Sequence, residues 1–408
     1  MRLAVTGMSV TDCMGNHTEN NFQKILDNTD GTDIDYEEMK NYCVLEKGFI
    51  RRSSLRHFDE SAISTLYNVG KAIEDANLDL DIDRDAPVIT SSIRGPVATN
   101  LELRAKQYKA EISIEHLEGE EWEEAHEINR RKFLKHNPYK WVNTLHDFVP
   151  SFVSQSYGLY GPTFQLSSTC SGGLQALEIA KMYLQSGKKY AIVTGFENLS
   201  SDTASGVLFE SIGAASPDNI VRPFCETRNG TSLKDGCGAL IVETEENAKA
   251  RGATPHVYIE DVQNFNDANN ILQPHEGGRG ILKSFDAIFK NSVIKPEDVD
   301  YINAHGTGTI TGDPIELNVM KDIFDEGTPV SSLKGHVGHG LGACGIIETI
   351  YTAQMMKHSV ATSNKNMIKP IDNYFDILRD NKRMDINFAI NNSFGFGGRA
   401  STALLSRD

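Results

Sequence analysis

The chain has 408 residues, more than the roughly 100–200 of a typical single domain, so it indicates two domains or one large fold built by duplication. Hydrophobic residues make up 39% and charged residues 24%, a balance that allows a buried core and argues against disorder. The formal net charge of −16 argues against general binding to nucleic acid, although a local basic patch for an acidic partner remains open.

The N-terminal run MRLAVTGMSV lacks the features of a signal peptide and predicts a first strand, Arg2 to Thr6, that ends at Gly7. No apolar run approaches the roughly 18–20 residues of a membrane helix. The cysteines show no CxxC pairing, so we expect reduced thiols in a cytoplasmic protein, one of them free for chemistry. They are Cys13, Cys43, Cys170, Cys225, Cys237 and Cys344.

Short β-prone runs alternate with longer amphipathic stretches along the rest of the chain. Strands are predicted at 86–90, 163–168, 190–195, 237–244, 257–262, 299–305 and 384–393. Helices are predicted at 62–77, 172–186, 279–291, 314–324 and 343–357. This alternation predicts an α/β fold with largely buried sheets.

The stretch 101–140 differs from its surroundings because it is crowded with charge, as in EHLEGEEWEEAHEINRRKFLK. Its apolar residues form only a loose stripe, which favours a solvated helical excursion. The alternative is an insertion that covers a pocket mouth or forms a subunit contact.

Cys170 lies in the segment STCSGG, where a β-prone run ends and small residues begin an apolar helix. The pattern predicts a tight turn that presents the thiol, as at a nucleophile elbow. We expect the helix N-terminus to lower the pKa of this thiol and raise its thiolate fraction. From this segment alone, a nucleophile and an inert buried cysteine remain equally open.

His305 follows the predicted strand VDYINA and precedes the polar run GTGT, a suitable position for an imidazole that faces a ligand. In isolation, such a histidine is more typical of a turn bonded to backbone.

The segment SSLKGHVGHGLGACG carries Lys334, His336 and His339, with Cys344 close behind. A metal site is disfavoured, because the two histidines lack the glutamate and the helical frame of the usual zinc motif. A lysine and a histidine on one loop can instead stabilise a developing enolate or oxyanion. Glu348, on the following helix, is a candidate ion-pair partner of Lys334, although an ordinary surface glutamate remains open.

The run NNSFGFGG near the C-terminus predicts a turn whose backbone N–H groups point at a ligand. Phe394 and Phe396 bring apolar side chains to the same place. Four glycine-rich segments that carry a cysteine, two histidines and a lysine together indicate one catalytic site.

These segments resemble a β-ketoacyl synthase of the thiolase superfamily. STCSGG is similar to the nucleophile segment, YINAHGTGTITGDPIE to the first histidine segment, SSLKGHVGHGLGACG to the segment of the lysine and second histidine, and NNSFGFGG to the gating loop. The resemblance spans essentially the whole chain. It implies a five-layered α/β/α/β/α fold with two similar halves, 1–245 and 246–408, an insertion at about 101–140, and a dimer.

The resemblance implies a decarboxylative Claisen condensation in which Cys170 takes an acyl group from a pantetheine thioester. Backbone N–H groups of Cys170 and Phe396 would bind the oxyanion. His305 and His339 would stabilise the enolate formed from a malonyl thioester. No metal or redox cofactor is implied, because loss of CO2 supplies the driving force.

Further roles are implied around these residues. Lys334, held by Glu348, would support the histidines electrostatically, and Thr307 and Thr309 would bond to the pantetheine arm. The gate is implied at Phe394, Phe396 and Gly397.

Departures from the family concern the substrate more than the reaction. In the loop 223–239, Cys225 and Cys237 replace acidic residues, so local ion pairs are in doubt, and 265–274 lacks the family's common Tyr-His. The insertion is similar to that of ketosynthase α subunits of type II polyketide systems, which pair with a chain-length factor. Chain-length factors lack the nucleophile, so Cys170 assigns this chain to the catalytic side.

The implied partner is an acyl carrier protein, which is acidic and needs local positive charge on this enzyme. Docking candidates are Arg52, Arg56, His57, Arg130, Arg131 and Lys132. Scattered solubilising charge is the alternative for each. We therefore expect an elongating ketosynthase, as a homodimer or with a chain-length-factor-like homologue; fatty-acid elongation and a non-condensing acyltransferase or hydrolase remain alternatives.

Overall fold

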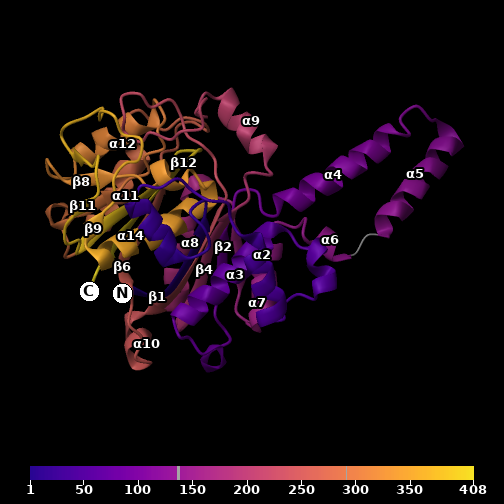
Figure 1. Ribbon diagram of the computed structural model, residues 1–408, viewed down its shortest axis with the longest axis horizontal. Coiled ribbons are helices and arrows are strands. Elements are labelled where there is room, and N and C mark those ends of the chain that lie inside the picture. Colours follow the sequence, from indigo (N-terminus) through magenta and orange to yellow (C-terminus); the bar gives the residue numbers. More distant parts are fainter. Residues whose placement is uncertain (136–137, 291) are drawn as a thin grey trace.

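The computed structural model describes residues 1–135, 138–290 and 292–408. They form a layered body from which one helical arm projects (Figure 1). The two termini lie together, since the guanidinium of Arg2 donates a 2.6 Å hydrogen bond to the backbone oxygen of Asp408.

Within the described residues, eleven strands build the main sheet. In the first half of the chain these are β1 (Leu3–Asp12), β2 (Val88–Ser91), β3 (Thr163–Leu166), β4 (Tyr190–Glu197) and β5 (Gly236–Thr244). In the second half they are β6 (Val257–Asn266), β7 (Tyr301–Asn303), β8 (Pro329–Ser331), β10 (Asp376–Ile377), β12 (Phe388–Gly395) and β13 (Arg399–Ser406). A small second sheet pairs β9 (Val360–Ala361) with β11 (Lys382–Arg383).

The strand order repeats between the two halves. The units β3-β2-β4-β5-β1 and β8-β7-β12-β13-β6 each have two parallel pairs followed by two antiparallel pairs. They join where Leu3, Ala4 and Val5 of β1 pair with β6. This repetition confirms the predicted α/β fold of two similar halves. The expected boundary after residue 245 falls at the start of α10 (Glu245–Ala250), between the units, and stays a prediction.

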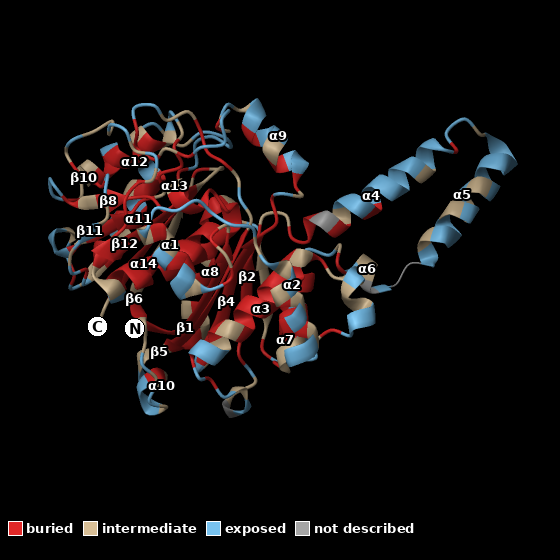
Figure 2. Cartoon of the chain, viewed as in Figure 1, coloured by how far each residue is buried: buried red, intermediate tan, exposed pale blue. Residues whose placement is uncertain are grey.

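Helices form layers on and between the two units. The central layer is α8 (Gly172–Gln185) and α14 (Cys344–His358), which contact strands of both units. The outer layers are α3 (Glu60–Asp75) and α7 (Phe148–Tyr157) on one side, and α11 (Arg279–Lys290) and α12 (Gly312–Lys321) on the other. Along β5, Leu240 faces the central core and Ile241 the outer core, as expected for a sheet buried on both faces (Figure 2).

Shorter helices complete the body. They are α1 (Thr18–Leu26), α2 (Tyr36–Asn41), α9 (Thr203–Ser211) and α13 (Lys334–Val337). None of the helices in the described ranges is long and apolar enough to cross a membrane. All six cysteines are free thiols.

The predicted strands and helices are present, and most differences lie at their ends. The first strand continues past Gly7 to Asp12, so the expectation that it ends at Gly7 is wrong. A Cβ at Gly7 would lie 2.1 Å from the carbonyl oxygen of Ala72 on α3, so this glycine permits close packing rather than a turn. The last residue of the helix predicted at 279–291 lies outside the described residues.

The charged stretch forms a helical hairpin, the arm, made of α4 (Val97–Ile112) and α5 (Gly119–Leu134) and followed by α6 (Pro138–Val142). The arm projects from the body and is mostly exposed (Figure 2). Exposed apolar side chains on it include Tyr108, Ile112, Trp122, Ile128 and Leu134. The helical expectation is correct, although the hairpin begins before residue 101, and residues 136 and 137 lie outside the described chain.

Candidate active site

Cys170 lies in a single 3-10 turn, Thr169–Ser171, between β3 and α8. Thr169 adopts a φ of +51°, a strained conformation that permits the sharp turn. Small residues surround the turn: a Cβ at Gly395 would lie 2.1 Å from the Thr169 hydroxyl oxygen. The predicted elbow is therefore present, and the thiol is buried at its tip.

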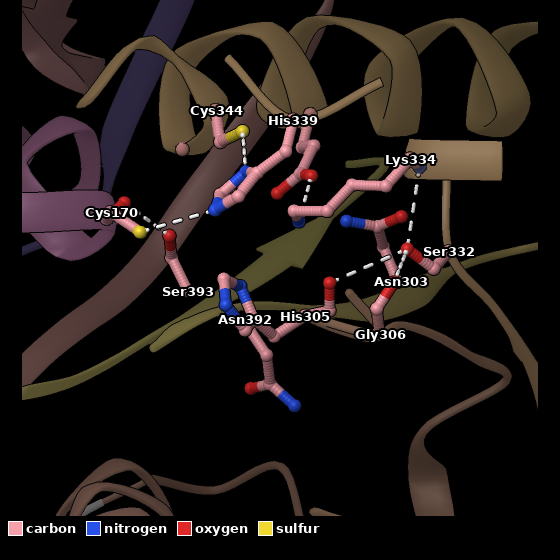
Figure 3. A network of polar contacts seen from close by, with 12 residues as sticks. Cys170, Asn303, His305, Gly306, Ser332, Lys334, His339, Cys344, Asn392 and Ser393 are labelled. Atoms are coloured by element: carbon pink, nitrogen blue, oxygen red, sulfur yellow. Dashed lines mark hydrogen bonds and ion pairs between the residues drawn. The ribbon is translucent and has the colours of Figure 1, made fainter. Parts of the chain in front are cut away.

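The expectation that the helix N-terminus lowers the pKa of the Cys170 thiol is wrong. Burial raises the pKa of Cys170 to about 12, and the nearby cation of Lys334 only partly opposes this effect. Burial, together with Lys334, holds the pKa of His339 well below its usual value. The resting pair is therefore a neutral thiol and a neutral imidazole, with Cys170 Sγ 3.1 Å from His339 Nε2 (Figure 3).

His305 enters the site from the end of β7. The ring centroids of His305 and His339 lie 5.5 Å apart, and one ligand atom from each of Cys170, His305 and His339 falls within 4.8 Å of the others. Burial first, then Lys334 and His339, lower the pKa of His305 well below its usual value. Two neutral imidazoles thus face one thiol.

Glu316 on α12 fixes the backbone of the first histidine. Its carboxylate accepts hydrogen bonds of 2.7 Å from the N–H of His305 and 2.8 Å from the N–H of Gly306. The hydroxyls of Thr307 and Thr309 lie 3.0 Å apart and both line the cavity beside Cys170. Their predicted contact with a pantetheine arm stays a prediction.

Lys334 on α13 forms an ion pair with Glu348 on α14, as predicted, and both side chains are buried. Burial acts to lower the pKa of Lys334, but Glu348 outweighs it, so the ammonium stays charged. Burial raises the pKa of Glu348 to about 7, although Lys334 opposes the shift. The charge of Lys334, the positive member of the pair, acts on the two imidazoles.

The C-terminal turn closes the site from β12. The hydroxyl of Ser393 donates a 2.7 Å hydrogen bond to the carbonyl of Cys170. The ring of Phe394 lies 5.6 Å from that of His305, and Phe396 lies 5.3 Å from Phe209 of α9. The gating role of Phe394, Phe396 and Gly397, and the oxyanion role of the Cys170 and Phe396 N–H groups, stay predictions.

A cavity of about 390 Å³ opens onto these residues. Its apolar wall includes Phe209, Ile212 and Leu272, and Cys170, His305 and His339 lie on its lining. No described residue of the arm lines it, which argues against the alternative that the insertion covers this pocket mouth.

The predicted absence of a metal stays a prediction. His336, considered with His339 and Cys344 as a metal set, instead contacts the carbonyl of Ser363 at 2.9 Å, while Cys344 Sγ lies 3.1 Å from Nδ1 of His339. Cys170, His305 and His339 do offer three ligand atoms close together. The charge of Lys334 disfavours a cation there.

In the altered loop 223–239, Glu226 forms an ion pair with Lys369 at 2.7 Å. Cys225 Sγ lies 3.2 Å from the hydroxyl of Thr227, and Cys237 is buried in the outer core. Arg228 instead donates to the backbone oxygens of Thr309 at 3.1 Å and Ile310 at 2.9 Å. The Arg228 side chain of the loop therefore supports the backbone of the segment that carries Thr307 and Thr309.

The docking candidates lie on the surface. Arg52 and Arg56 are exposed and His57 is partly buried, all three on the turn Arg52–His57. Arg130, Arg131 and Lys132 lie on α5 and are exposed. The two arginines both pair with Glu127 of the same helix, which makes them weaker candidates for docking a carrier protein. Their contact with a carrier protein stays a prediction.

Several site residues were missed by sequence reasoning. Phe209, Arg228, Glu316 and Ser393 contact the site from elements far apart in the chain, and sequence reasoning assigned none of them a role. The TGDPIE segment does contain Glu316, but its carboxylate was not assigned a task.

Comparison with known proteins agrees with this geometry. Residues 1–248 match the beta-ketoacyl synthase N-terminal domain, and residues 257–367 match the beta-ketoacyl synthase C-terminal domain. A 3-oxoacyl-(acyl-carrier-protein) synthase 2 of Staphylococcus aureus strain MRSA252 is 28% identical, with 100% of this chain and 98% of that protein covered. The mitochondrial 3-oxoacyl-(acyl-carrier-protein) synthase of Arabidopsis thaliana is 32% identical, over 70% of this chain and 65% of that protein.

Solved structures share the fold. The ishigamide ketosynthase/chain length factor has a TM-score of 0.84 at 20% identity, with 100% of this chain and 99% of that chain covered. A ketosynthase in complex with its type II PKS acyl-carrier protein has a TM-score of 0.79 at 23% identity, with the same coverage. The chain therefore belongs to the β-ketoacyl synthase family and is an acyltransferase with the thiolase fold.

Proposed function

We propose that this chain condenses an acyl group held on Cys170 with a malonyl thioester carried by an acyl carrier protein. The observation that carries the proposal is the 3.1 Å contact between Cys170 Sγ and His339 Nε2. The ring of His305 lies beside that of His339, and all three residues line the same cavity. The reaction needs no metal or redox cofactor.

The first half-reaction is acyl transfer. The sulfur of Cys170 attacks the acyl carbonyl, a new thioester bond forms, and the bond to the carrier thiol breaks. The proton of Cys170 leaves with the carrier thiol, so the transfer is balanced. Backbone N–H groups at Cys170 and Phe396 are proposed to bind the oxygen while it carries negative charge.

The second half-reaction is condensation. The malonyl group loses CO2, and the electron pair of the broken carbon–carbon bond forms an enolate. His305 and His339 donate hydrogen bonds to its oxygen, and Lys334 adds positive charge. The enolate carbon attacks the acyl-Cys170 carbonyl, the carbon–sulfur bond breaks, and the released thiolate takes up one proton from solvent.

Two surfaces of the chain are evidence for a partner subunit. The strand β3 is the edge of the sheet and is only partly buried, so its outer side can pair with another strand. The arm exposes apolar side chains that a monomer leaves in water. We propose that a second copy or a homologous chain covers both surfaces.

The test uses intact-protein mass spectrometry with acyl- and malonyl-carrier proteins. The expected result is an acyl adduct on Cys170 that converts to a 3-ketoacyl product and CO2, and a Cys170→Ala variant that forms neither. Cys237→Ala, which removes a buried thiol of the outer core, is the matched control. Acyl transfer or hydrolysis without a condensed product would support the non-condensing alternative.

For the pathway, we propose type II polyketide extension, supported by the arm and by the neighbours described as type II PKS and chain length factor proteins. Relatives named 3-oxoacyl-(acyl-carrier-protein) synthase favour fatty-acid elongation instead. Co-purification with a homologue that lacks the nucleophile supports the polyketide assignment, whereas a homodimer that elongates saturated acyl chains supports the fatty-acid assignment.

A further inference from the structure

A second thiol contacts the far side of the His339 ring. Cys344 is the first residue of α14, and its Sγ lies 3.1 Å from Nδ1, while Cys170 Sγ lies 3.1 Å from Nε2 (Figure 3). Both ring nitrogens therefore face sulfur. Cys344 is 3% exposed and His339 is 1% exposed, so bulk water does not compete for the contact.

The protonation states of Cys344 and His339 bear on which atom donates the hydrogen bond between them. Burial raises the pKa of Cys344 well above its usual value, so this thiol keeps its proton. The neutral His339 ring carries a single N–H, which leaves one nitrogen as an acceptor. Cys344 thus has an S–H to donate, and Nδ1 of His339 is the side-chain acceptor that the structure places beside it.

We propose that Cys344 is a positioning residue whose S–H donates to Nδ1 of His339 and holds the ring proton on Nε2, facing Cys170 and the cavity. No bond is formed or broken in this role. The inference rests on the proposed function, because Nε2–H is the group that would donate to the enolate oxygen.

The two half-reactions depend differently on this tautomer. During acyl transfer, Nε2 can assist either as a donor to the sulfur or as an acceptor of its proton. During condensation only the protonated nitrogen helps, because a lone pair aimed at the enolate oxygen repels it. Loss of Cys344 should therefore slow decarboxylation more than acylation.

The kinetic test compares Cys344→Ala with Cys344→Ser, which restores a hydrogen-bond donor of similar size. We expect the alanine variant to slow decarboxylation of malonyl-carrier protein by about 5- to 10-fold, with a smaller change in acylation of Cys170. The serine variant should recover most of the rate. Cys237→Ala, which removes a buried thiol elsewhere, should match the wild type.

Equal decarboxylation rates in the wild type and Cys344→Ala would overturn the inference. So would a serine variant as slow as the alanine variant, or an equal loss in both half-reactions, since these results indicate a packing role.

The tautomer of the His339 ring can be measured without substrate. Nitrogen NMR of the histidine-labelled full chain should show His339 with Nδ1 unprotonated and Nε2 protonated, and a shift of this population in Cys344→Ala. A wild-type ring protonated at Nδ1 would overturn the inference. This readout is independent of the proposed function, which fails separately if the wild type makes no 3-ketoacyl product.

Discussion

The ammonium of Lys334 and the carboxylate of Glu348 form an ion pair that solvent hardly reaches, with side-chain exposures of 0% and 1%. Oxygen Oε2 of Glu348 has no hydrogen-bond partner among the described residues. The pair is therefore held mainly by its own attraction and is sensitive to loss of either member. Lys334 lowers the pKa of both His305 and His339, so the pair acts electrostatically on the proposed enolate donors.

Removal of one partner should strongly destabilise the fold. Glu348→Ala leaves the Lys334 ammonium buried without a counter-charge, and we expect the free energy of unfolding to fall by about 3–5 kcal/mol. Urea denaturation followed by circular dichroism measures the change. Lys357→Ala, which breaks an exposed pair with Glu19, is the control and should cost at most about 1 kcal/mol. Equal effects of the two substitutions would contradict the importance of burial.

The resting thiol should react slowly at neutral pH. Because the thiolate is the nucleophile and the pKa of Cys170 is about 12, alkylation by iodoacetamide should rise about tenfold per pH unit from pH 7 to 10. Peptide mapping reports the modification of Cys170 separately from the other thiols.

The same measurement tests the role of the nearby cation. Lys334 acts to lower the pKa of Cys170, so the neutral pair Lys334→Met with Glu348→Gln should alkylate more slowly at each pH. A fast rate in the wild type that does not change between pH 6 and 8 would instead indicate a thiolate–imidazolium pair.

Arg228 should matter for binding the carrier-bound substrate. Its guanidinium donates to the backbone oxygens of Thr309 and Ile310, so Arg228→Ala should loosen the segment proposed to hold the pantetheine arm. We expect KM for malonyl-carrier protein to rise by about tenfold, the equivalent of one or two hydrogen bonds, with a smaller change in kcat. Arg222→Ala, which breaks an ion pair with Asp218, is the control. A loss confined to kcat would contradict this role.

Local patterns predicted the elements and the chemistry well, because strands, helices and the residues at their ends are encoded in short runs. Cys170, His305, Lys334 and His339 each lie within a few residues of the end of a strand or helix, in glycine-rich surroundings that the sequence shows. The pKa of Cys170 was not predictable, because the helix terminus is local whereas burial comes from the whole fold.

Contacts that cross the molecule also escaped sequence reasoning. Ser393 contacts Cys170, which lies more than two hundred positions earlier in the chain. Cys344 was considered only as part of a disfavoured metal set, and its contact with Nδ1 of His339 was not predicted. The direction of the arm is likewise set by tertiary packing, so its charge pattern did not show that it leaves the cavity uncovered.

The close approach of the two central helices should depend on a glycine. A Cβ at Gly173 of α8 would lie 2.9 Å from the backbone nitrogen of Ile346 and 3.0 Å from Cα of Gly345, both on α14. These are backbone atoms that cannot move aside alone, so Gly173→Ala should force the helices apart and cost about 1–3 kcal/mol of unfolding free energy. Since Cys170 precedes α8 and Cys344 begins α14, acylation should slow as well.

Gly206→Ala provides the matched control, because Gly206 lies within α9 and a Cβ there would meet no atom within 4 Å. In that helix alanine should be neutral or stabilise the fold by up to about 1 kcal/mol, since alanine has the higher helix propensity. Urea denaturation of the two variants, together with the rate of Cys170 acylation, measures the contrast. A Gly173→Ala variant as stable and as quickly acylated as Gly206→Ala would show that the helices adjust, and that the spacing of the catalytic elements does not depend on this contact.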